Sequence, residues 1–191
     1  MDKKDFRVAI FGSARIKRND VIYKDVYELA RFLGNMGVDV ITGGGPGLMD
    51  AANSGLMSEA KKSNTGARSI GLGIKLPKEK EFNKHIDIKK EYQKFSGRLD
   101  EFMSLSDIVI VAPGGIGTML EFLYTWQLVQ VRHIKKIPII LLGEQWSSLI
   151  KWIRQNPLKK KYLDKEDLDN VYLAKDIEDC LKIIEETRRG G

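Results

Sequence analysis

Apolar and polar positions alternate along the chain in a pattern that predicts strands and helices in turn. Short apolar runs bounded by glycine, proline or charged residues are typical of buried strands, and longer stretches with apolar residues three and four positions apart are typical of helices. We predict strands over residues 7–11, 38–42, 68–74, 107–112, 138–142 and 171–173. We predict helices over residues 21–36, 48–62, 97–105, 117–131, 146–155 and 177–188.

Residues 78–95 form the longest stretch without a regular pattern. The stretch is rich in charged residues, so we expect a long irregular loop, in which residues 86–88 are the candidate for a short strand.

The regular alternation predicts one α/β domain over residues 1–191, a Rossmann-like, doubly wound parallel sheet with helices on both faces. Right-handed crossovers place every strand-to-helix turn on the same edge of such a sheet. Ligands bind outside the carboxyl ends of the strands, at that edge. The sequence contains no internal repeat, low-complexity tract or linker that would divide the chain.

The turn after the strand at 107–112 has the residue types of an anion site. It reads Pro113-Gly114-Gly115-Ile116-Gly117-Thr118, and a predicted helix opens at once. Glycines let the backbone approach a ligand closely, and the helix presents unpaired N–H groups and the positive end of its dipole. A phosphate satisfies both, and the Thr118 hydroxyl can add a donor. The alternative is that the glycines only permit a sharp reversal of the chain.

Two further turns on the same edge favour the binding interpretation. Gly43-Gly44-Gly45-Pro46-Gly47 also ends a strand and opens a helix, and Gly12-Ser13 ends the first strand. The first turn offers one glycine, which is not the dinucleotide fingerprint, and no G-K-[ST] follows a glycine cluster as in a P-loop. The predicted phosphate- and nucleotide-binding residues are therefore Gly12, Ser13, Gly43, Gly44, Gly45, Gly114, Gly115, Gly117 and Thr118.

A carboxylate and a guanidinium are expected beside these turns. Glu121 lies three residues after Thr118, on the same side of the helix, so it should face the crevice. The helix N-terminus should favour its ionised form. Arg98, in the preceding helix, can bridge phosphate or hydroxyl oxygens with its planar fork. We predict a reaction centre at Arg98 and Glu121, although spacing alone leaves a structural salt bridge open.

Composition and charge narrow the class of protein. The chain has 191 residues, 42% hydrophobic and 30% charged, which is typical of a soluble globular protein. Its net charge is +6, but lysines are interleaved with acidic residues along the chain. We therefore interpret this charge as that of an ordinary solvated surface and expect no nucleic-acid partner. A DNA-binding module is kept as a third hypothesis because of that charge.

The cysteine, the histidines and the apolar runs argue against a disulfide, a metal site and a membrane span. The single cysteine, Cys180, cannot form an internal disulfide and is expected to be a buried thiol. His85 and His133 are isolated, so we expect surface positions and no metal site. Apolar runs fall far short of the roughly 20 residues that a membrane span needs. We expect a cytoplasmic protein without membrane contact.

The nine residues from Pro113 to Glu121 fit the signature P-G-G-x-G-T-x-x-E and resemble the LOG ("lonely guy") family. Its founding members are cytokinin riboside 5′-monophosphate phosphoribohydrolases. The cluster at 43–47, followed by Leu48-Met49, resembles the other motif of that family, and the likeness extends over residues 8–152. Many members were labelled lysine decarboxylases, but nothing here identifies a lysine that would carry pyridoxal phosphate.

The resemblance implies a reaction. LOG enzymes hydrolyse the N-glycosidic bond of a nucleoside 5′-monophosphate, here AMP or an N6-substituted AMP, to a free base and ribose 5-phosphate. The catalytic arginine and glutamate of the family match Arg98 and Glu121. No cofactor or metal is implied. The family also implies a homodimer or higher homo-oligomer, with the helix after Glu121 near the interface.

Four positions depart from the family pattern. Leu99 stands where a lysine usually follows the arginine, and Ile116 where the signature usually has an aromatic residue. Leu120 and Tyr124 occupy positions that are commonly acidic. Leu99 and Leu120 favour an alternative function, a non-catalytic carrier of a nucleotide or of the molybdenum cofactor on the same fold.

Overall fold

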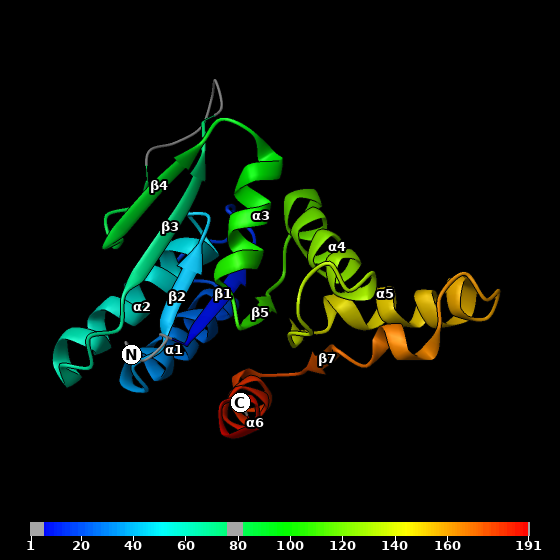
Figure 1. The fold of residues 1–191 in the computed structure, drawn as a ribbon. Coiled ribbons are helices and arrows are strands. Elements are labelled where there is room, and N and C mark those ends of the chain that lie inside the picture. The colour runs from blue at the N-terminus through cyan, green and yellow to red at the C-terminus, as the bar shows by residue number, and fades with distance from the viewer. Residues whose placement is uncertain (1–5, 76–81, 191) are drawn as a thin grey trace.

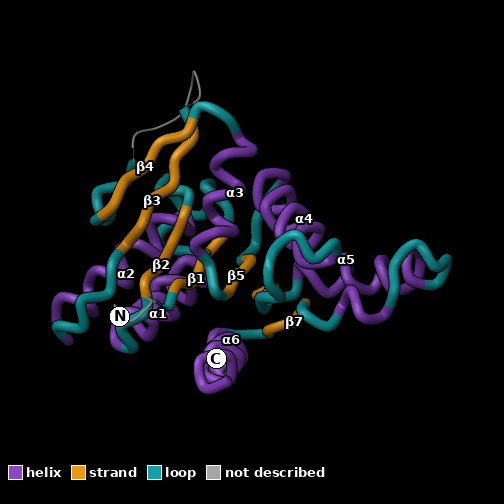
Figure 2. The backbone as a smooth tube through the Cα atoms, viewed as in Figure 1, coloured by secondary structure: helices purple, strands orange, loops and turns teal. Residues whose placement is uncertain are grey.

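The computed structural model describes residues 6–75 and 82–190. Its strands form one parallel sheet in the order β4-β3-β2-β1-β5-β6-β7 (Figures 1 and 2). From β1 the chain winds outward to one edge through β2, β3 and β4, and then to the other edge through β5, β6 and β7. This is the predicted doubly wound arrangement. The strands are β1 Arg7–Phe11, β2 Asp39–Thr42, β3 Ser69–Ile74, β4 Ile88–Tyr92, β5 Ile108–Val111, β6 Ile139–Leu142 and β7 Val171–Ala174.

Helices cover both faces of the sheet (Figure 1). The first core lies under α1, α2 and α6, and the second lies under α3, α4 and α5. Both cores are built from the apolar positions that gave the helices their periodicity. The helices are α1 Val21–Asn35, α2 Leu48–Ser63, α3 Phe95–Leu105, α4 Ile116–Gln130, α5 Gln145–Ile153 and α6 Ile177–Gly190.

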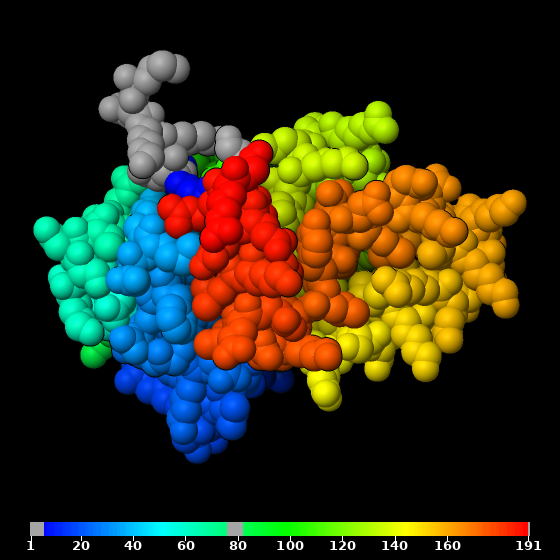
Figure 3. Space-filling view, turned by 90° about the horizontal axis from the view of Figure 1, so that it is seen from below, coloured from blue at the N-terminus to red at the C-terminus, as the bar shows by residue number. Residues whose placement is uncertain are grey.

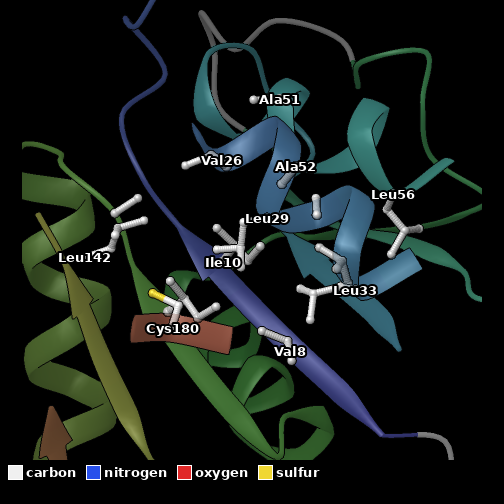
Figure 4. Close-up of a cluster of buried hydrophobic side chains, with 14 of the residues drawn as sticks. Val8, Ile10, Val26, Leu29, Leu33, Ala51, Ala52, Leu56, Leu142 and Cys180 are labelled. Atoms are coloured by element: carbon white, nitrogen blue, oxygen red, sulfur yellow. The ribbon is translucent and has the colours of Figure 1, made fainter. Parts of the chain in front are cut away.

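The first core packs aliphatic side chains from the central strands against three helices. Figure 4 shows Ile10 of β1 beside Leu29 of α1, with Leu56 of α2 farther along the same core. Cys180 of α6 lies in the same core and is fully buried. Burial raises the pKa of its thiol to about 12, so the predicted buried, unreactive cysteine is confirmed.

The second core is aromatic and holds α3 and α4 against the sheet. Phe11 of β1 meets Phe102 of α3 edge to face, with ring centroids 5.0 Å apart. Phe122 of α4 stacks on Trp126 at 5.5 Å. These rings anchor α3 and α4 on the same face of the sheet. Because the two helices lie close together there, side chains near the rings can contact each other from one helix to the other.

Residues 88–92 form an edge strand in the segment that was expected to be irregular, of which 78–81 lie outside the described residues. β4 pairs in parallel with β3, from Ile88 opposite Ile70 to Tyr92 opposite Ile74. Its first four residues are exposed, so the strand is stabilised by backbone pairing and has no apolar alternation to reveal it. The helix that follows begins at Phe95, two residues earlier than predicted.

α5 continues beyond its predicted core into an irregular helical extension. Arg154–Leu158 form a π-helical turn that contains Pro157, and Lys165–Leu168 form a 3-10 turn. Figures 1 and 3 show this part of the chain extending outward beyond the sheet. Across the described residues, no helix is both long and apolar enough to cross a membrane.

Candidate active site

The topology brings the three predicted turns together. β1 lies between β2 and β5, so the turns that follow these strands are neighbours at one sheet edge. The Ser13 N–H donates to the Pro113 carbonyl at 3.0 Å, and the Ser13 carbonyl accepts from the Leu48 N–H at 3.0 Å. The backbone of the first turn is thus hydrogen-bonded to both glycine turns, and the predicted convergence is found.

Close contacts explain two of the glycines. Gly47 has a φ of +69°, and a Cβ there would lie 2.3 Å from the Ser13 carbonyl oxygen. Gly47 is therefore required by the fold, because the two turns could not approach each other otherwise. A Cβ on Gly12 would lie 2.9 Å from the Leu48 side chain, so Gly12 leaves room for that side chain.

A buried polar network fixes the turn at 43–45. The Thr42 hydroxyl accepts from the Gly44 N–H at 3.0 Å and donates to Asn53 Oδ1 at 2.8 Å. The Asn83 amide donates to the Gly44 and Gly45 carbonyls at 3.1 and 2.9 Å. The Gly44 N–H is therefore already hydrogen-bonded within the protein, so Gly44 shapes the turn and does not offer this N–H to a ligand. Sequence reasoning did not single out Asn53 or Asn83, because neither stands in a motif.

Gln145 holds the signature turn from the start of α5. Its Oε1 accepts from the Gly114 N–H at 3.1 Å, and its Nε2 donates to the Gly114 carbonyl at 2.7 Å. A Cβ on Gly114 would lie 2.1 Å from the hydroxyl oxygen of Thr118, which is itself only 5% exposed. Gly114 thus contributes shape, and its N–H is not free for a ligand. No sequence motif pointed to Gln145.

Gly115 and Gly117 differ from the other glycines, because the protein itself does not need them. A Cβ on either would meet nothing within 4 Å, and neither has a positive φ. Gly115 is the N-cap of α4 and supplies no side-chain cap, and both glycines are exposed. The N–H groups of the first helical turn have no acceptor within the helix. The turn therefore leaves an open, positively polarised space that a side chain would fill.

Arg98 and Glu121 meet beside this space. Arg98 Nη2 donates to Glu121 Oε1 at 2.9 Å, from α3 to α4. Their side chains are only 11% and 13% exposed. A Cβ on Gly43 would lie 3.6 Å from Arg98 Nη1, so the guanidinium also lies next to the second glycine turn. The structure places the two predicted reaction-centre residues in direct contact, at the edge where the turns converge.

The surroundings of this pair hold it in a desolvated position. The Arg98 guanidinium carbon lies 5.7 Å from the ring centre of Phe95 and 5.8 Å from that of Phe102. Arg98 Nε is buried and has no hydrogen-bond partner in the described part of the chain. A buried donor without a partner is uncommon in proteins and is a feature of sites that bind another group.

Burial controls the protonation of Glu121. Removal from water raises the pKa of its carboxyl to about 7, and the positive charge of Arg98 opposes that rise. The expectation that the helix N-terminus would favour the ionised form is thus outweighed by desolvation. At neutral pH the carboxyl is poised between its two forms, which suits an acid or base in a reaction.

His85 is not the isolated surface residue that the sequence suggested. Its Nδ1 lies 3.0 Å from Asp50 Oδ1, and Asp50 also accepts from the Tyr23 hydroxyl at 2.7 Å. This cluster ties the loop before β4 to α2 and α1. His133 is exposed, as predicted. Among the residues described, no group of three or more His, Cys, Asp or Glu side chains could hold a metal ion.

The four departures from the family pattern have different structural settings. Leu99 is 4% exposed and packs inside the protein, whereas Ile116 and Leu120 are 79% and 46% exposed on α4. The Tyr124 hydroxyl donates to Asp100 Oδ1. Tyr124 therefore links α4 to α3 beside the Arg98–Glu121 pair.

Comparisons with known proteins agree with this fold. The sequence model of the family described as "Possible lysine decarboxylase" matches residues 49–184. A pyrimidine/purine nucleotide 5′-monophosphate nucleosidase of Escherichia coli K12 is 26% identical over 148 residues, 74% of this chain and 32% of that protein. The chain thus spans about a third of the length of this curated relative.

Solved structures share the fold. The molybdenum cofactor binding protein of Rippkaea orientalis is 21% identical, with a TM-score of 0.70 over 97% of this chain and 98% of that one. The molybdenum cofactor carrier protein of Chlamydomonas reinhardtii is 19% identical, with a TM-score of 0.67 over 97% and 99% of the two chains. At these identities the likeness establishes the α/β architecture.

Proposed function

The chain belongs to the LOG family, whose sequence model is described as possible lysine decarboxylase, and we propose that it is a nucleoside 5′-monophosphate phosphoribohydrolase. Its substrate would be AMP or an N6-substituted AMP, and its products a free base and ribose 5-phosphate. The E. coli relative is named for the same class of reaction, which supports the proposal.

The observation that carries the proposal is the position of the Arg98–Glu121 pair. A desolvated carboxylate held by a guanidinium at 2.9 Å lies beside an uncapped helix N-terminus. The helix terminus fits a phosphate, because its N–H groups and dipole attract an anion. A phosphate held there would fix the attached ribose near Glu121, so that binding energy orients the reacting carbon.

The reaction follows from these positions. As the bond between C1′ and the base nitrogen breaks, its electron pair leaves with the base and positive charge develops on the ribose, as in glycoside hydrolysis. The ionised Glu121 carboxylate stabilises that charge and accepts a proton from the water that attacks C1′. The proton then passes to the departing base. Arg98 holds the carboxylate and, with Nη1 beside Gly43, can contact a ribose or phosphate oxygen.

Chromatography of a reaction with AMP tests the proposal. We expect adenine and ribose 5-phosphate as the products. Adenosine with inorganic phosphate would instead identify a phosphatase and contradict the proposal. A panel of purine and pyrimidine monophosphates and an N6-substituted AMP would then establish the preferred base.

A non-catalytic carrier is the second candidate, and Leu99 is the observation that favours it. Leu99 stands where the family usually has a lysine, and it packs inside the protein. The positive charge of that lysine is therefore missing from the site. The fold neighbours named as molybdenum cofactor proteins make the same architecture compatible with carrying a cofactor. Calorimetric binding of AMP or another phosphorylated ligand without release of any base would support the carrier and overturn the hydrolase.

We further propose a homodimer that forms through α4. Ile116, Leu120 and Leu123 are 79%, 46% and 48% exposed and recur at helical spacing on this helix. Such a row of apolar residues is typical of a surface that packs against another protein. Sedimentation should give twice the chain mass for the parent and a smaller species for Leu123→Asp. A monomeric parent would contradict the dimer.

A further inference from the structure

One segment, which we name the basic arm (residues 145–163), has five basic residues and no acidic one, and it lies between Glu144 and the acidic stretch that begins at Asp164. It comprises α5, the π-helical turn and the loop after it. The chain has a net charge of +6, and the arm contributes +5 of it, so the other residues together contribute only +1. The interleaving expected from the whole sequence does not hold here. The arm contains no acidic residue, and its basic residues are Lys151, Arg154, Lys159, Lys160 and Lys161.

These charges are exposed and available. All five basic side chains are exposed, and within the described residues none of them forms an ion pair. By contrast, Lys90 and Lys135 elsewhere on the surface pair with Glu101 and Asp107. Five unpaired cations on one segment produce a local positive potential that attracts a polyanion.

Two large aromatic side chains stand among the charges. Trp152 is 55% exposed and Tyr162 is 78% exposed. Tryptophan is highly buried on average, so an exposed Trp152 offers a large flat ring to a ligand. Both rings lie within the basic arm, so flat apolar surfaces and cations occur side by side in sequence.

The arm presents Lys151, Trp152 and Arg154 on its helical part, and Lys159, Lys160, Lys161 and Tyr162 on the turn that follows. Trp146, Ile150 and Ile153 of α5 are buried in the second core, which leaves Lys151 and Trp152 on the opposite side of the helix. At the tip, the Tyr162 N–H donates to the Pro157 carbonyl at 2.9 Å, and the Asn156 side chain donates to the Trp152 carbonyl at 3.1 Å. Figures 1 and 3 show the arm extending outward beyond the sheet.

We propose that the basic arm binds single-stranded nucleic acid. The lysines and the arginine contact backbone phosphates, and Trp152 and Tyr162 stack on unpaired bases. A membrane surface fits less well, because α5 buries Trp146, Ile150 and Ile153 in the protein and leaves Trp152 as its one exposed large apolar side chain, which is too little for an apolar face that enters lipid. The inference does not depend on the proposed phosphoribohydrolase activity, since none of these side chains belongs to the Arg98–Glu121 site.

Fluorescence anisotropy with labelled oligo-dT and oligo-rU of about 20 nucleotides, long enough for one binding site, tests the inference. We expect binding that weakens with salt. Replacing Lys151, Lys159 and Lys160 by Gln should lower the salt slope by about 2, because each lost phosphate contact removes roughly 0.7. The same charge change at exposed Lys24, Lys61 and Lys182, outside the arm, should leave binding unchanged.

The aromatic residues provide a second, independent readout. Trp152→Ala and Tyr162→Ala should each weaken binding by about tenfold, with circular dichroism confirming the fold. The inference would be overturned by an absence of salt-dependent binding, by an equal loss of affinity in the control triple variant, or by binding to phosphatidylserine-containing vesicles without binding to either oligonucleotide. A change of oligomeric mass in the arm variants, with oligonucleotide binding unaltered, would also overturn it.

Discussion

Arg98 and Glu121 lie 23 residues apart in sequence, yet the guanidinium of one donates to the carboxylate of the other at 2.9 Å. The contact is possible because the aromatic core holds α3 and α4 side by side on one face of the sheet. It links the protonation of Glu121 to the charge of Arg98. Most of the behaviour that we expect from the site follows from that link.

The pH dependence of base release should follow the protonation of Glu121. Burial raises the pKa of this carboxyl to about 7, and the mechanism needs its ionised form. We therefore expect kcat/KM for AMP to rise with pH through about 7 and to level off above it. In Arg98→Gln the cation that lowers this pKa is absent, so the rise should move to higher pH. A pH profile that is flat, or that moves to lower pH in Arg98→Gln, would contradict the assigned base.

The same protonation should appear in the folding equilibrium. A glutamate in the unfolded chain has an ordinary pKa of 4.5, whereas the folded protein raises that of Glu121 to about 7. Between these values the folded state retains a proton that the unfolded state has lost, so this group lowers the free energy of unfolding as pH rises. Urea unfolding over that range should show a smaller decline for Glu121→Gln than for the parent. Glu186→Gln, an exposed control on α6, should behave as the parent does.

Gly117→Ala separates a ligand-binding turn from a merely sharp one. A Cβ at Gly117 meets nothing within 4 Å, and alanine favours the helix over glycine by up to about 1 kcal/mol. We expect an unchanged or slightly higher Tm together with weaker AMP binding, because the methyl group fills the space of the phosphate. Calorimetry on the folded variant measures this, and unaltered affinity would mean that no ligand occupies the turn.

Gly47→Ala is the matched comparison. Its Cβ would lie 2.3 Å from a backbone oxygen, and its φ of +69° disfavours any side chain. We expect a loss of stability of about 2 kcal/mol or more, because the strain adds to the steric conflict. Gly117→Ala should therefore lose affinity for AMP, whereas Gly47→Ala should lose stability.

Gln145→Ala should loosen the signature turn without removing any atom that contacts the substrate. It deletes both hydrogen bonds to Gly114, each of which contributes about 1 kcal/mol. We expect KM for AMP to rise several-fold and kcat to change less, since the phosphate site loses order while Arg98 and Glu121 stay in place. Gln155→Ala, an exposed control on the π-helical turn, should leave KM unchanged.

The sequence predicted the sheet and the meeting of the candidate site residues at one edge because the signals were local. Apolar runs gave the buried strands, and the turn at 113–118 marks the start of α4 within one residue. Glu121 followed from helical spacing. β4 did not follow, because its central residues Lys89, Lys90 and Glu91 are exposed and charged and its stability comes from pairing with β3.

The supporting residues of the site were missed for a different reason. Gln145 and Asn83 act through hydrogen bonds to glycine backbone 31 and 39 residues away. Such partners depend on how the chain folds back and have no spacing to recognise. The pKa of Glu121 was likewise misjudged, because spacing reveals the helix terminus but not the burial that outweighs it.

The decisive measurement of the proposed hydrolase is the rate of adenine release from AMP by the parent, Glu121→Gln and Glu186→Gln, with AMP binding measured separately for each. We expect adenine and ribose 5-phosphate from the parent and from Glu186→Gln. For Glu121→Gln we expect a rate lower by about 10²–10⁴-fold, because a positioned proton acceptor contributes that much. AMP binding by a parent protein that releases no base, or an equal rate from Glu121→Gln, would contradict the proposed hydrolase with Glu121 as its base.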